Sequence, residues 1–438
     1  MDNQVPARIA NILMNALKGG VVPRVGLEYI TVGRAQEIAA ILHDIDMVSE
    51  GGATFRFVVG KYGTGKSFLL QTIRNYATAM GFVVADADLS PERRFAGTKG
   101  QGLATYKELM QNLSTKSQPD GGALPLVLER WISGIQTTIR GQTGLEGEAF
   151  HRQVEARIYT VAGSLEGMIN GFEFAKAIVT YWRAYQQDDM AIKSNVLRWF
   201  RGEYVTRRDA KADLGINFII TDETWYDFLK IFAMFLVGAG YKGLLVLIDE
   251  LVNIYKIPNS ITRQNNYEKI LTIYNDTLQG KARHIGFLLG ATPQCLEDNF
   301  KGIFSYEALR SRLAEGHFAA DDMKDMTAPV IRLLMLTQEE MYVLVEKLRD
   351  IHARLYGYTP TLRHEDLMYF LTVEYNRVGA GTHITPREII RDFIELVNIL
   401  HQNPQKRAQD ILGSNSFEMA KGGLSDEDIH REFQDFEV

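Results

Sequence analysis

Eight consecutive residues, 60–67, combine glycines with a lysine and a serine in the spacing of a phosphate-binding loop. They read Gly-Lys-Tyr-Gly-Thr-Gly-Lys-Ser and match the pattern G-x-x-x-x-G-K-[ST] in full. The glycines allow backbone N–H groups to point inward at the start of a helix, where they bind anions. Lys66 adds a mobile positive charge for the β and γ phosphates, and Ser67 offers a hydroxyl to Mg²⁺.

The surroundings of this segment also favour a nucleotide site over a glycine turn that arises by chance. An apolar run that reads as a buried strand precedes the segment, and a helix with an apolar face follows it. We therefore predict that ATP and Mg²⁺ bind here. The residues expected to contact them are Gly60, Tyr62, Gly63, Thr64, Gly65, Lys66, Ser67 and Phe68.

Two carboxylates directly follow a second apolar run, residues 244–248. Ligands of open α/β sheets bind at the carboxyl ends of the strands, which is where Asp249 and Glu250 would lie. Hydrolysis of a nucleotide needs an acidic group for the metal and a group that orients water. We expect Asp249 to hold the Mg²⁺ shell and Glu250 to polarise the attacking water. The alternative for Asp249 is an ordinary helix N-cap.

A third apolar run, residues 286–290, leads into Ala-Thr-Pro-Gln. Thr292 would lie at the carboxyl end of this strand, beside Asp249 if the two strands are neighbours. Its hydroxyl could contact the γ-phosphate or the lytic water. A Thr-Pro pair is also a common helix start, and both roles are compatible.

Residues 384–389, Ile-Thr-Pro-Arg-Glu-Ile, contain nearly every signal of a helix start. Thr385 is the expected N-cap, Pro386 takes the first helical position, and Glu388 completes a capping box, while the two isoleucines can form a hydrophobic staple. Arg387 is then a cation in the first turn, where the helix dipole disfavours it by a few tenths of a kcal/mol. A nucleotide phosphate or a carboxylate such as Glu388 would remove that conflict.

Two further arginines, Arg310 and Arg312, follow the third apolar run within residues 307–313. In oligomeric ATPases an arginine in this region reaches the γ-phosphate of a neighbouring subunit and stabilises the charge of the transition state. Either residue could have that role. The alternative is that both lie on a solvated helix face.

The elements that must position these residues indicate an α/β fold. Short apolar runs at residues 55–59, 81–88, 243–248 and 285–290 predict strands of a parallel sheet, covered by helices on both faces. A surface loop is expected at residues 114–122, which contain Pro-Asp-Gly-Gly.

Helical patterns dominate the rest of the chain and suggest its domains. We assign residues 1–50 to N-terminal helices and residues 51–328 to the core, which carries a helical insertion at about 100–215. Residues 329–405 form a helical domain. The tail, 406–438, ends in a strongly acidic stretch that is either solvated or a docking segment.

Composition excludes several classes of protein. The net charge of −6 argues against a protein that coats nucleic acid non-specifically, and the single cysteine, Cys295, excludes an internal disulfide and a cysteine-rich zinc site. The histidines show no zinc-site spacing. The chain lacks a signal-peptide pattern, and its most apolar stretch, residues 231–241, is far shorter than the ~20 residues of a spanning helix. We expect a soluble protein of the reducing cytoplasm without membrane contact.

Together these residues resemble an AAA+ ATPase of the origin-recognition-like branch. In that resemblance residues 60–67 are Walker A, residues 244–250 are Walker B, Thr292 is sensor 1, Arg310 or Arg312 is the arginine finger, and Arg387 is sensor 2. Residues 31–37, Thr-Val-Gly-Arg-Ala-Gln-Glu, are similar to a V-G-R-x-x-E segment, which implies that Gly33 and Arg34 lie near the adenine. The resemblance further implies a C-terminal helical lid and a homo-oligomer.

A closer resemblance is to the P-loop ATPases of bacterial BREX phage-defence loci, the BrxD-like family. It rests on VGRAQEI, FRFVVGKYGTGKSFLL, GYKGLLVLIDELVNIY, GATPQCLED, ALRSRLAE and ITPREIIRDFIELV. This family implies ATP-dependent work on DNA or partner proteins, often beside a helicase or nuclease encoded nearby. Two departures are the helical insertion and the short segment after Arg387, which leaves little room for a DNA-binding winged helix.

Other functions fit the sequence less well. An ATP-gated scaffold that turns over poorly and recruits a helicase or nuclease is the main alternative, and Glu250 favours hydrolysis over it. A small-molecule kinase is disfavoured by the sensor-like arginines. Cations and aromatic residues between 198 and 211 resemble a single-strand binder, but nearby aspartates favour a solvated helix face with a packed Trp199.

Overall fold

The computed structural model describes residues 5–163, 171–314, 325–377 and 385–413. These residues form two compact units, each assembled from segments that are distant in sequence. The loop unit comprises residues 1–35, 60–72 and 333–438, and the sheet unit comprises residues 36–59 and 73–332. The assignment of residues 1–50, 51–328, 329–405 and 406–438 to separate parts of the chain remains a prediction. The acidic tail from residue 414 and Ile384 of the expected staple lie outside the described residues.

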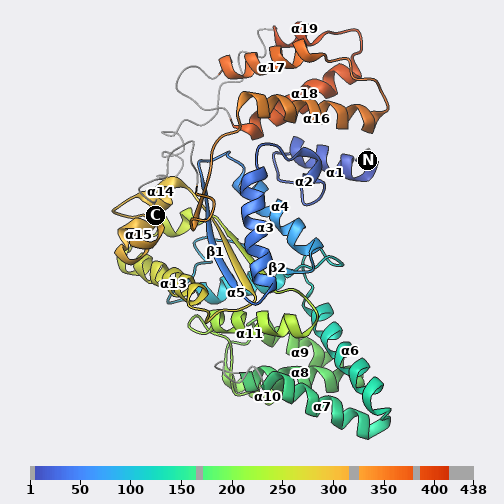
Figure 1. Ribbon diagram of the computed structural model, residues 1–438, viewed down its shortest axis with the longest axis vertical. Coiled ribbons are helices and arrows are strands. Elements are labelled where there is room, and N and C mark those ends of the chain that lie inside the picture. Colours follow the sequence, from blue (N-terminus) through green and yellow to red (C-terminus); the bar gives the residue numbers. More distant parts are fainter. Residues whose placement is uncertain (1–4, 164–170, 315–324, 378–384, 414–438) are drawn as a thin grey trace. The chain divides into compact units, whose positions relative to one another are not determined.

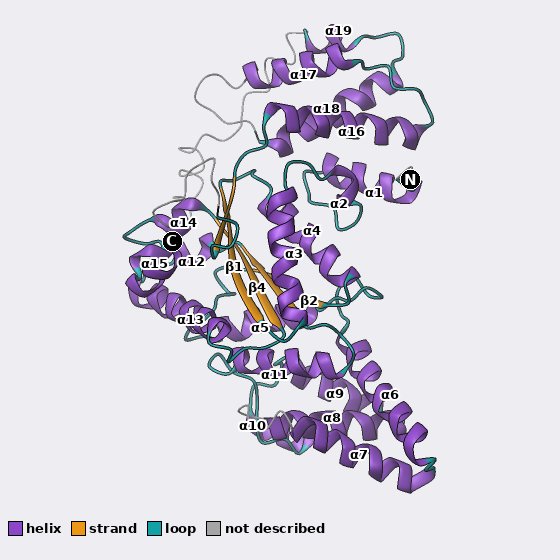
Figure 2. Ribbon diagram, in the orientation of Figure 1, coloured by secondary structure: helices purple, strands orange, loops and turns teal. Residues whose placement is uncertain are grey.

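A five-stranded parallel sheet forms the centre of the α/β fold, as the apolar runs predict (Figure 2). The strand order is β2–β3–β4–β1–β5. The first four strands coincide with the predicted runs. Strands β1, β3 and β4 are buried on both faces, whereas β2 ends in the half-buried Asp86 and the exposed Asp88. The strands are β1 (Ala53–Gly60), β2 (Val83–Asp88), β3 (Leu244–Asp249), β4 (Ile285–Ala291) and β5 (Val330–Leu333).

Side chains that alternate along β1 show which helices cover the two faces of the sheet. Phe55 lies 5.6 Å from Tyr274 of α13 (Ser260–Leu278), ring centre to ring centre. Arg56 points to the other face, where its Nη2 donates to Asp44 of α3 (Ala35–Ser49) at 2.8 Å. Successive strand residues face opposite sides, so α13 and α3 cover opposite faces.

The sheet unit contains a large set of helices between β2 and β3. In Figure 1, α7 lies beside α8 and α8 beside α9, and the apolar faces of these helices belong to the same buried cluster as the strands. The helices are α5 (Gln101–Gln111), α6 (Leu124–Thr143), α7 (Gly147–Gly163), α8 (Gly171–Gln186), α9 (Met190–Phe200), α10 (Arg207–Leu214) and α11 (Trp225–Gly238). After β3 come α12 (Val252–Tyr255) and α13, and after β4 come α14 (Pro293–Glu297), a 3₁₀ turn (Ile303–Ser305) and α15 (Glu307–Leu313).

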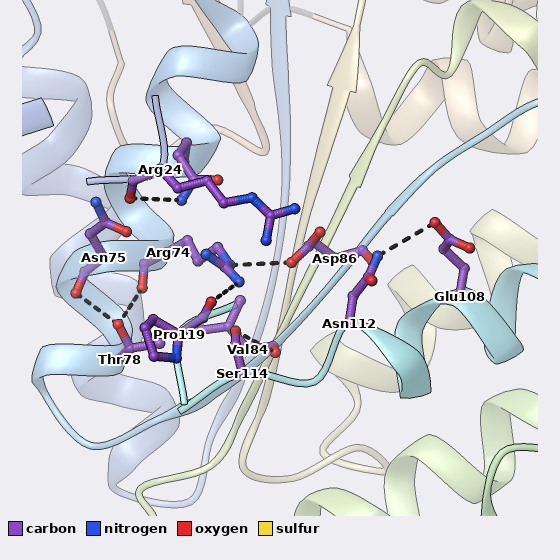
Figure 3. Close-up of polar contacts among 11 residues, drawn as sticks. Arg24, Arg74, Asn75, Thr78, Val84, Asp86, Glu108, Asn112, Ser114 and Pro119 are labelled. Carbon is purple, nitrogen blue, oxygen red and sulfur yellow. Dashed lines mark hydrogen bonds and ion pairs between the residues drawn. The ribbon is translucent and has the colours of Figure 1, made fainter. Parts of the chain in front are cut away.

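The outer edge of β2 is covered by the start of the segment for which we predict a surface loop (Figure 3). Ser114 donates from its backbone N–H to the carbonyl of Val84 at 2.8 Å, and Val84 donates back at 3.0 Å. Ser114 is buried, whereas residues 116–120 are exposed, so the prediction of a surface loop is wrong for its first residues. The buried Arg74 pairs with Asp86 of β2 at 3.2 Å. The two hydrogen bonds between Ser114 and Val84 satisfy backbone groups that an open strand edge would expose.

The loop unit is helical and has its own apolar core. The core combines the N-terminal helices α1 (Ala7–Lys18) and α2 (Leu27–Ile30) with the C-terminal helices. The helix start predicted at residues 385–388 occurs as expected. The C-terminal helices are α16 (Gln338–Tyr356), α17 (His364–Arg377), α18 (Pro386–Gln402) and α19 (Ala408–Leu412). Helix α4 (Lys66–Ala79) begins in the loop unit and continues into the sheet unit.

Candidate functional site

The phosphate loop has the backbone geometry that its glycines predict. Gly63 and Gly65 adopt left-handed conformations, with φ of 81° and 88°, which side chains other than glycine rarely tolerate. A Cβ on Gly60 would lie 2.3 Å from Thr64 Oγ1, so the loop also needs glycine where it begins. The turn ends directly at α4, whose first residue is Lys66. The loop therefore presents backbone N–H groups at a helix N-terminus.

Lys66 and Arg34 hold this loop from two sides. Lys66 Nζ donates to the carbonyl oxygens of Gly60 at 2.9 Å and Lys61 at 3.1 Å, which places its ammonium group over the loop. Arg34 is buried, and its Nη2 donates to the carbonyl of Thr64 at 2.9 Å and to that of Leu334 at 2.6 Å. Arg34 therefore supports the loop backbone. That contact is a structural one, and the expected role near the adenine remains a prediction.

Gly33 and Phe68 are held by packing. Gly33 has a φ of 65°, and a Cβ there would meet the carboxylate of Glu340 at 2.2 Å. Phe68, in the first turn of α4, is partly buried against the core of the loop unit. Phe68 directly follows the loop in sequence, and Gly33 precedes Arg34, which donates to the loop. The contact of Gly33 and Phe68 with nucleotide remains a prediction.

The first turn of α18 packs directly on the phosphate loop. A Cβ on Gly63 would lie 2.6 Å from the methyl carbon of Thr385, so the N-cap of α18 touches the loop at that glycine. Arg387 donates from Nη1 to the hydroxyl of Tyr62 at 2.9 Å, and its guanidinium carbon lies 5.5 Å from the centre of the Tyr62 ring. The structure thus brings Arg387 and the loop together.

The capping box at the start of α18 forms as predicted. Thr385 accepts from the backbone N–H of Glu388, and a Glu388 carboxylate oxygen accepts from the Thr385 backbone at 2.8 Å. The same oxygen accepts from the Thr385 hydroxyl at 2.8 Å. Among the described residues Arg387 makes no ion pair and contacts Tyr62, so the carboxylate alternative does not hold, while a nucleotide phosphate as its partner remains a prediction.

In the sheet unit, Asp249 and Glu250 lie at the carboxyl end of β3 as expected. Asp249 is buried, and its Oδ1 accepts from the backbone N–H of Glu250 at 2.8 Å. Leu251 is the N-cap of the following helix, so the N-cap alternative for Asp249 is wrong. Glu250 is exposed and has a φ of 61°. A residue other than glycine in this strained region is often found at a functional site.

A third carboxylate, Asp88, lies beside this pair and was not predicted. Asp88 pairs in register with Asp249 across β2 and β3. Burial, together with the negative charges of Asp249, Glu250 and Asp86, raises the pKa of Asp88 to about 6, while Arg93 opposes the shift. Sequence order does not reveal which strands are neighbours, but an aspartate that ends an apolar strand is a signal that could have identified it.

Thr292 follows β4, which is the neighbour of β3 as the prediction required. Its hydroxyl accepts from the backbone N–H of Cys295 at 3.2 Å and caps α14, so the helix-start role is confirmed. A role toward γ-phosphate remains a prediction. Cys295 is buried, donates from Sγ to the carbonyl of Leu251 at 3.4 Å, and behaves as a small apolar residue.

Comparison with protein families shows to which family this chain belongs. Residues 5–416 match the family described as BREX system ATP-binding protein BrxC/D. The chain belongs to this family. Membership confirms the BrxD-like resemblance and implies an ATP-binding role in phage defence. A comparison with curated proteins found no match.

The arginines expected to act between subunits of this BREX family member lie on α15 and are exposed. Arg310 pairs with Glu307 at 3.5 Å, and Arg312 Nη1 donates to the carbonyl of Ala308 at 2.6 Å. Both contacts are within one exposed helix, which agrees with the solvated-helix alternative. A role toward a second subunit remains a prediction.

The aromatic residues of the possible single-strand-binding region are buried. Trp199 donates from Nε1 to the carbonyl of Phe218 at 2.8 Å, and Tyr204 donates to Asp213 at 2.8 Å. Buried rings cannot stack on bases, so the packed-tryptophan alternative holds for this region. In the described part of the chain, every helix is too short or too polar to cross a bilayer.

Proposed function

We propose that this member of the BREX ATP-binding family is an AAA+ ATPase that hydrolyses ATP and works as a homo-oligomer. The observation that supports this best is the contact between the phosphate loop and the first turn of α18 within one compact unit. An arginine at that turn can sense the phosphates that the loop binds. The origin-recognition-like branch, with α16–α19 as lid and α5–α10 as insertion, is part of the proposal.

The residues of the proposed reaction divide into binding and hydrolysis. Backbone N–H groups of residues 60–67 and the ammonium of Lys66 hold the phosphates of ATP. Glu250 orients the attacking water and takes its proton. Its exposed position directly after the buried Asp249 supports this role.

Magnesium is implied by this chemistry, and the oxygen donors of the chain fit it. In the described residues no group of three or more acidic, histidine or cysteine side chains forms a cation site. Mg²⁺ is usually bound by one or two protein ligands together with water and substrate phosphates, so a small donor set is appropriate. The Ser67 hydroxyl and the Asp249 carboxylate would hold the ion. The bound ion would neutralise negative charge on the phosphates.

The remaining predicted roles complete the proposal. Thr292 contacts the γ-phosphate or the lytic water, Arg387 contacts the phosphates from the lid, and Arg310 or Arg312 acts on ATP of a neighbouring subunit. Gly33 and Arg34 border the adenine. The proposed location is the cytoplasm. The energy of ATP hydrolysis drives remodelling of DNA or of a partner protein. The candidate partner is a helicase or nuclease of the same locus.

Phosphate release tests hydrolysis and the subunit contact. We expect wild type to release phosphate from ATP, with DNA or partner present if needed. The Glu250→Gln variant, which keeps shape but loses the base, should be slower by about 100-fold or more. Arg312→Ala should also be slow. If wild type releases no phosphate under any of these conditions, the ATPase proposal fails and the ATP-gated scaffold replaces it.

A further inference from the structure

Tyr62, at the third position of the phosphate loop, is expected to contact the nucleotide, but the chemistry described above gives its side chain no role. It is 65% exposed, and yet its ring and hydroxyl both face Arg387. Position 3 of the loop pattern accepts any residue, so the pattern itself does not require an aromatic side chain there.

Arg387 occupies a position where a cation needs support. It lies in the first turn of α18, where the helix dipole is unfavourable to positive charge. The adjacent carboxylate of Glu388 is engaged in the capping box with Thr385. An arginine side chain also has several freely rotating bonds, and fixing it costs entropy.

Two contacts hold Arg387 at the loop. The guanidinium lies over the face of Tyr62, and the Tyr62 hydroxyl accepts a hydrogen bond at 2.9 Å. The hydrogen bond uses Nη1, so the guanidinium has further N–H groups with which to bind a phosphate.

We propose that Tyr62 is a positioning residue that holds Arg387 in place for the terminal phosphate of ATP. This inference rests on the proposed function of Arg387 and adds a residue that acts through it. Tyr62 lowers the entropy that Arg387 loses when it binds phosphate, and so increases the preference of the site for ATP over ADP.

A double-mutant cycle on nucleotide affinity tests the inference. The probes are methylanthraniloyl derivatives of ATP and ADP, titrated with Mg²⁺ into the full chain. We expect Arg387→Ala to weaken ATP binding by about 10-fold and ADP binding little. Tyr62→Ala should weaken ATP binding by about 3- to 10-fold, and Tyr62→Phe, which keeps the ring, by less. In the Arg387→Ala background, Tyr62→Ala should have no further effect.

The controls separate this inference from the proposed function. Tyr369→Ala removes an equally polar aromatic residue that is 38% exposed on α17 and should leave ATP affinity unchanged. Lys66→Ala should abolish binding. If wild type does not bind ATP, both proposals fail. Suppose that wild type binds ATP and Lys66→Ala does not. The role of Tyr62 alone is then refuted by either of two results: an ATP affinity of Tyr62→Ala within about twofold of wild type, or a loss of affinity from Tyr62→Ala that persists in the Arg387→Ala background.

Discussion

At the scale of single residues, the site depends on glycines whose conformation and surroundings exclude a side chain. Gly63 combines both constraints, because its φ is 81° and Thr385 of α18 lies where a Cβ would be. Gly357 is a matched comparison in the same unit, since its φ is 71° and nothing lies within 4 Å of its added Cβ.

We expect Gly63→Ala to lower the stability of the loop unit and its affinity for ATP. The left-handed conformation costs alanine roughly 1–2 kcal/mol at either position. Only at Gly63 must α18 also move away from the loop. Calorimetry should therefore show a larger loss for Gly63→Ala than for Gly357→Ala, and only Gly63→Ala should weaken ATP binding. Equal effects of the two changes on stability and binding would contradict the packing account.

A second residue-scale feature is the buried carboxyl of Glu374 on α17. Its side chain lies 3.5 Å from Arg377, which itself pairs with Asp392 of α18 at 3.0 Å. Burial, helped by the charges of Asp392 and Glu388 and opposed by Arg377, raises the pKa of Glu374 to about 7. The folded state therefore binds the Glu374 proton more tightly than the unfolded state.

This raised pKa predicts a pH-dependent effect of Glu374→Gln. As pH rises from about 4.5 toward about 7, folding of wild type requires a proton that the unfolded chain has released, so wild type loses stability in that window. Glutamine is neutral throughout. The advantage of Glu374→Gln in the free energy of unfolding should grow between pH 5 and 7 and then level off at about 1–3 kcal/mol. An advantage that does not vary with pH would refute this.

At the scale of elements, four of the strands and the start of α18 could be predicted, and the contacts between distant segments could not. Strands β3 and β4 are continuous apolar runs, the run of β1 is interrupted only by Arg56, and the signals before α18 are local. Strand β5 has only four residues, with two of them partly exposed, and gives no such run.

The contacts of the candidate site could be predicted only in part. Thr292 is expected beside Asp249 only if their two strands are neighbours, a condition that the sequence leaves open and that the pairing of β3 with β4 meets. The unfavourable position of Arg387 predicts a partner, for which a phosphate remains a prediction, but it does not indicate the contact with Tyr62, 325 residues away. An exposed aromatic residue in a glycine loop carries no signal for such a pairing. Asp88 was missed because strand order is a tertiary property.

The capping box of α18 is an element-scale feature with a direct test. Thr385→Ala removes the hydroxyl that accepts from Glu388 and the methyl group that touches Gly63. The loss of a capping side chain costs about 1 kcal/mol, and we expect a comparable fall in the stability of the loop unit. Thr385→Ser, which keeps the hydroxyl, should recover most of that stability in thermal unfolding. If serine and alanine are equivalent, the cap does not contribute.

At the scale of the whole molecule, the proposal requires more than one copy of the chain. Arg310 and Arg312 lie on the exposed face of α15, and their contacts described above are with Glu307 and Ala308 of the same helix. Light scattering with and without ATP and DNA measures the mass in solution. We expect a larger species with ATP, formed also by Glu250→Gln. A monomer under every condition would exclude an arginine that acts between subunits.

The central claim is that residues 60–67 bind ATP and that Glu250 makes the bound ATP react. Equilibrium ATP binding and phosphate release, measured on the same samples, test it most directly. Lys66→Ala should neither bind ATP nor release phosphate. Glu250→Gln should bind ATP as wild type does, and its phosphate release should be slower by about 100-fold or more. Wild-type rates of phosphate release from Glu250→Gln would contradict the account.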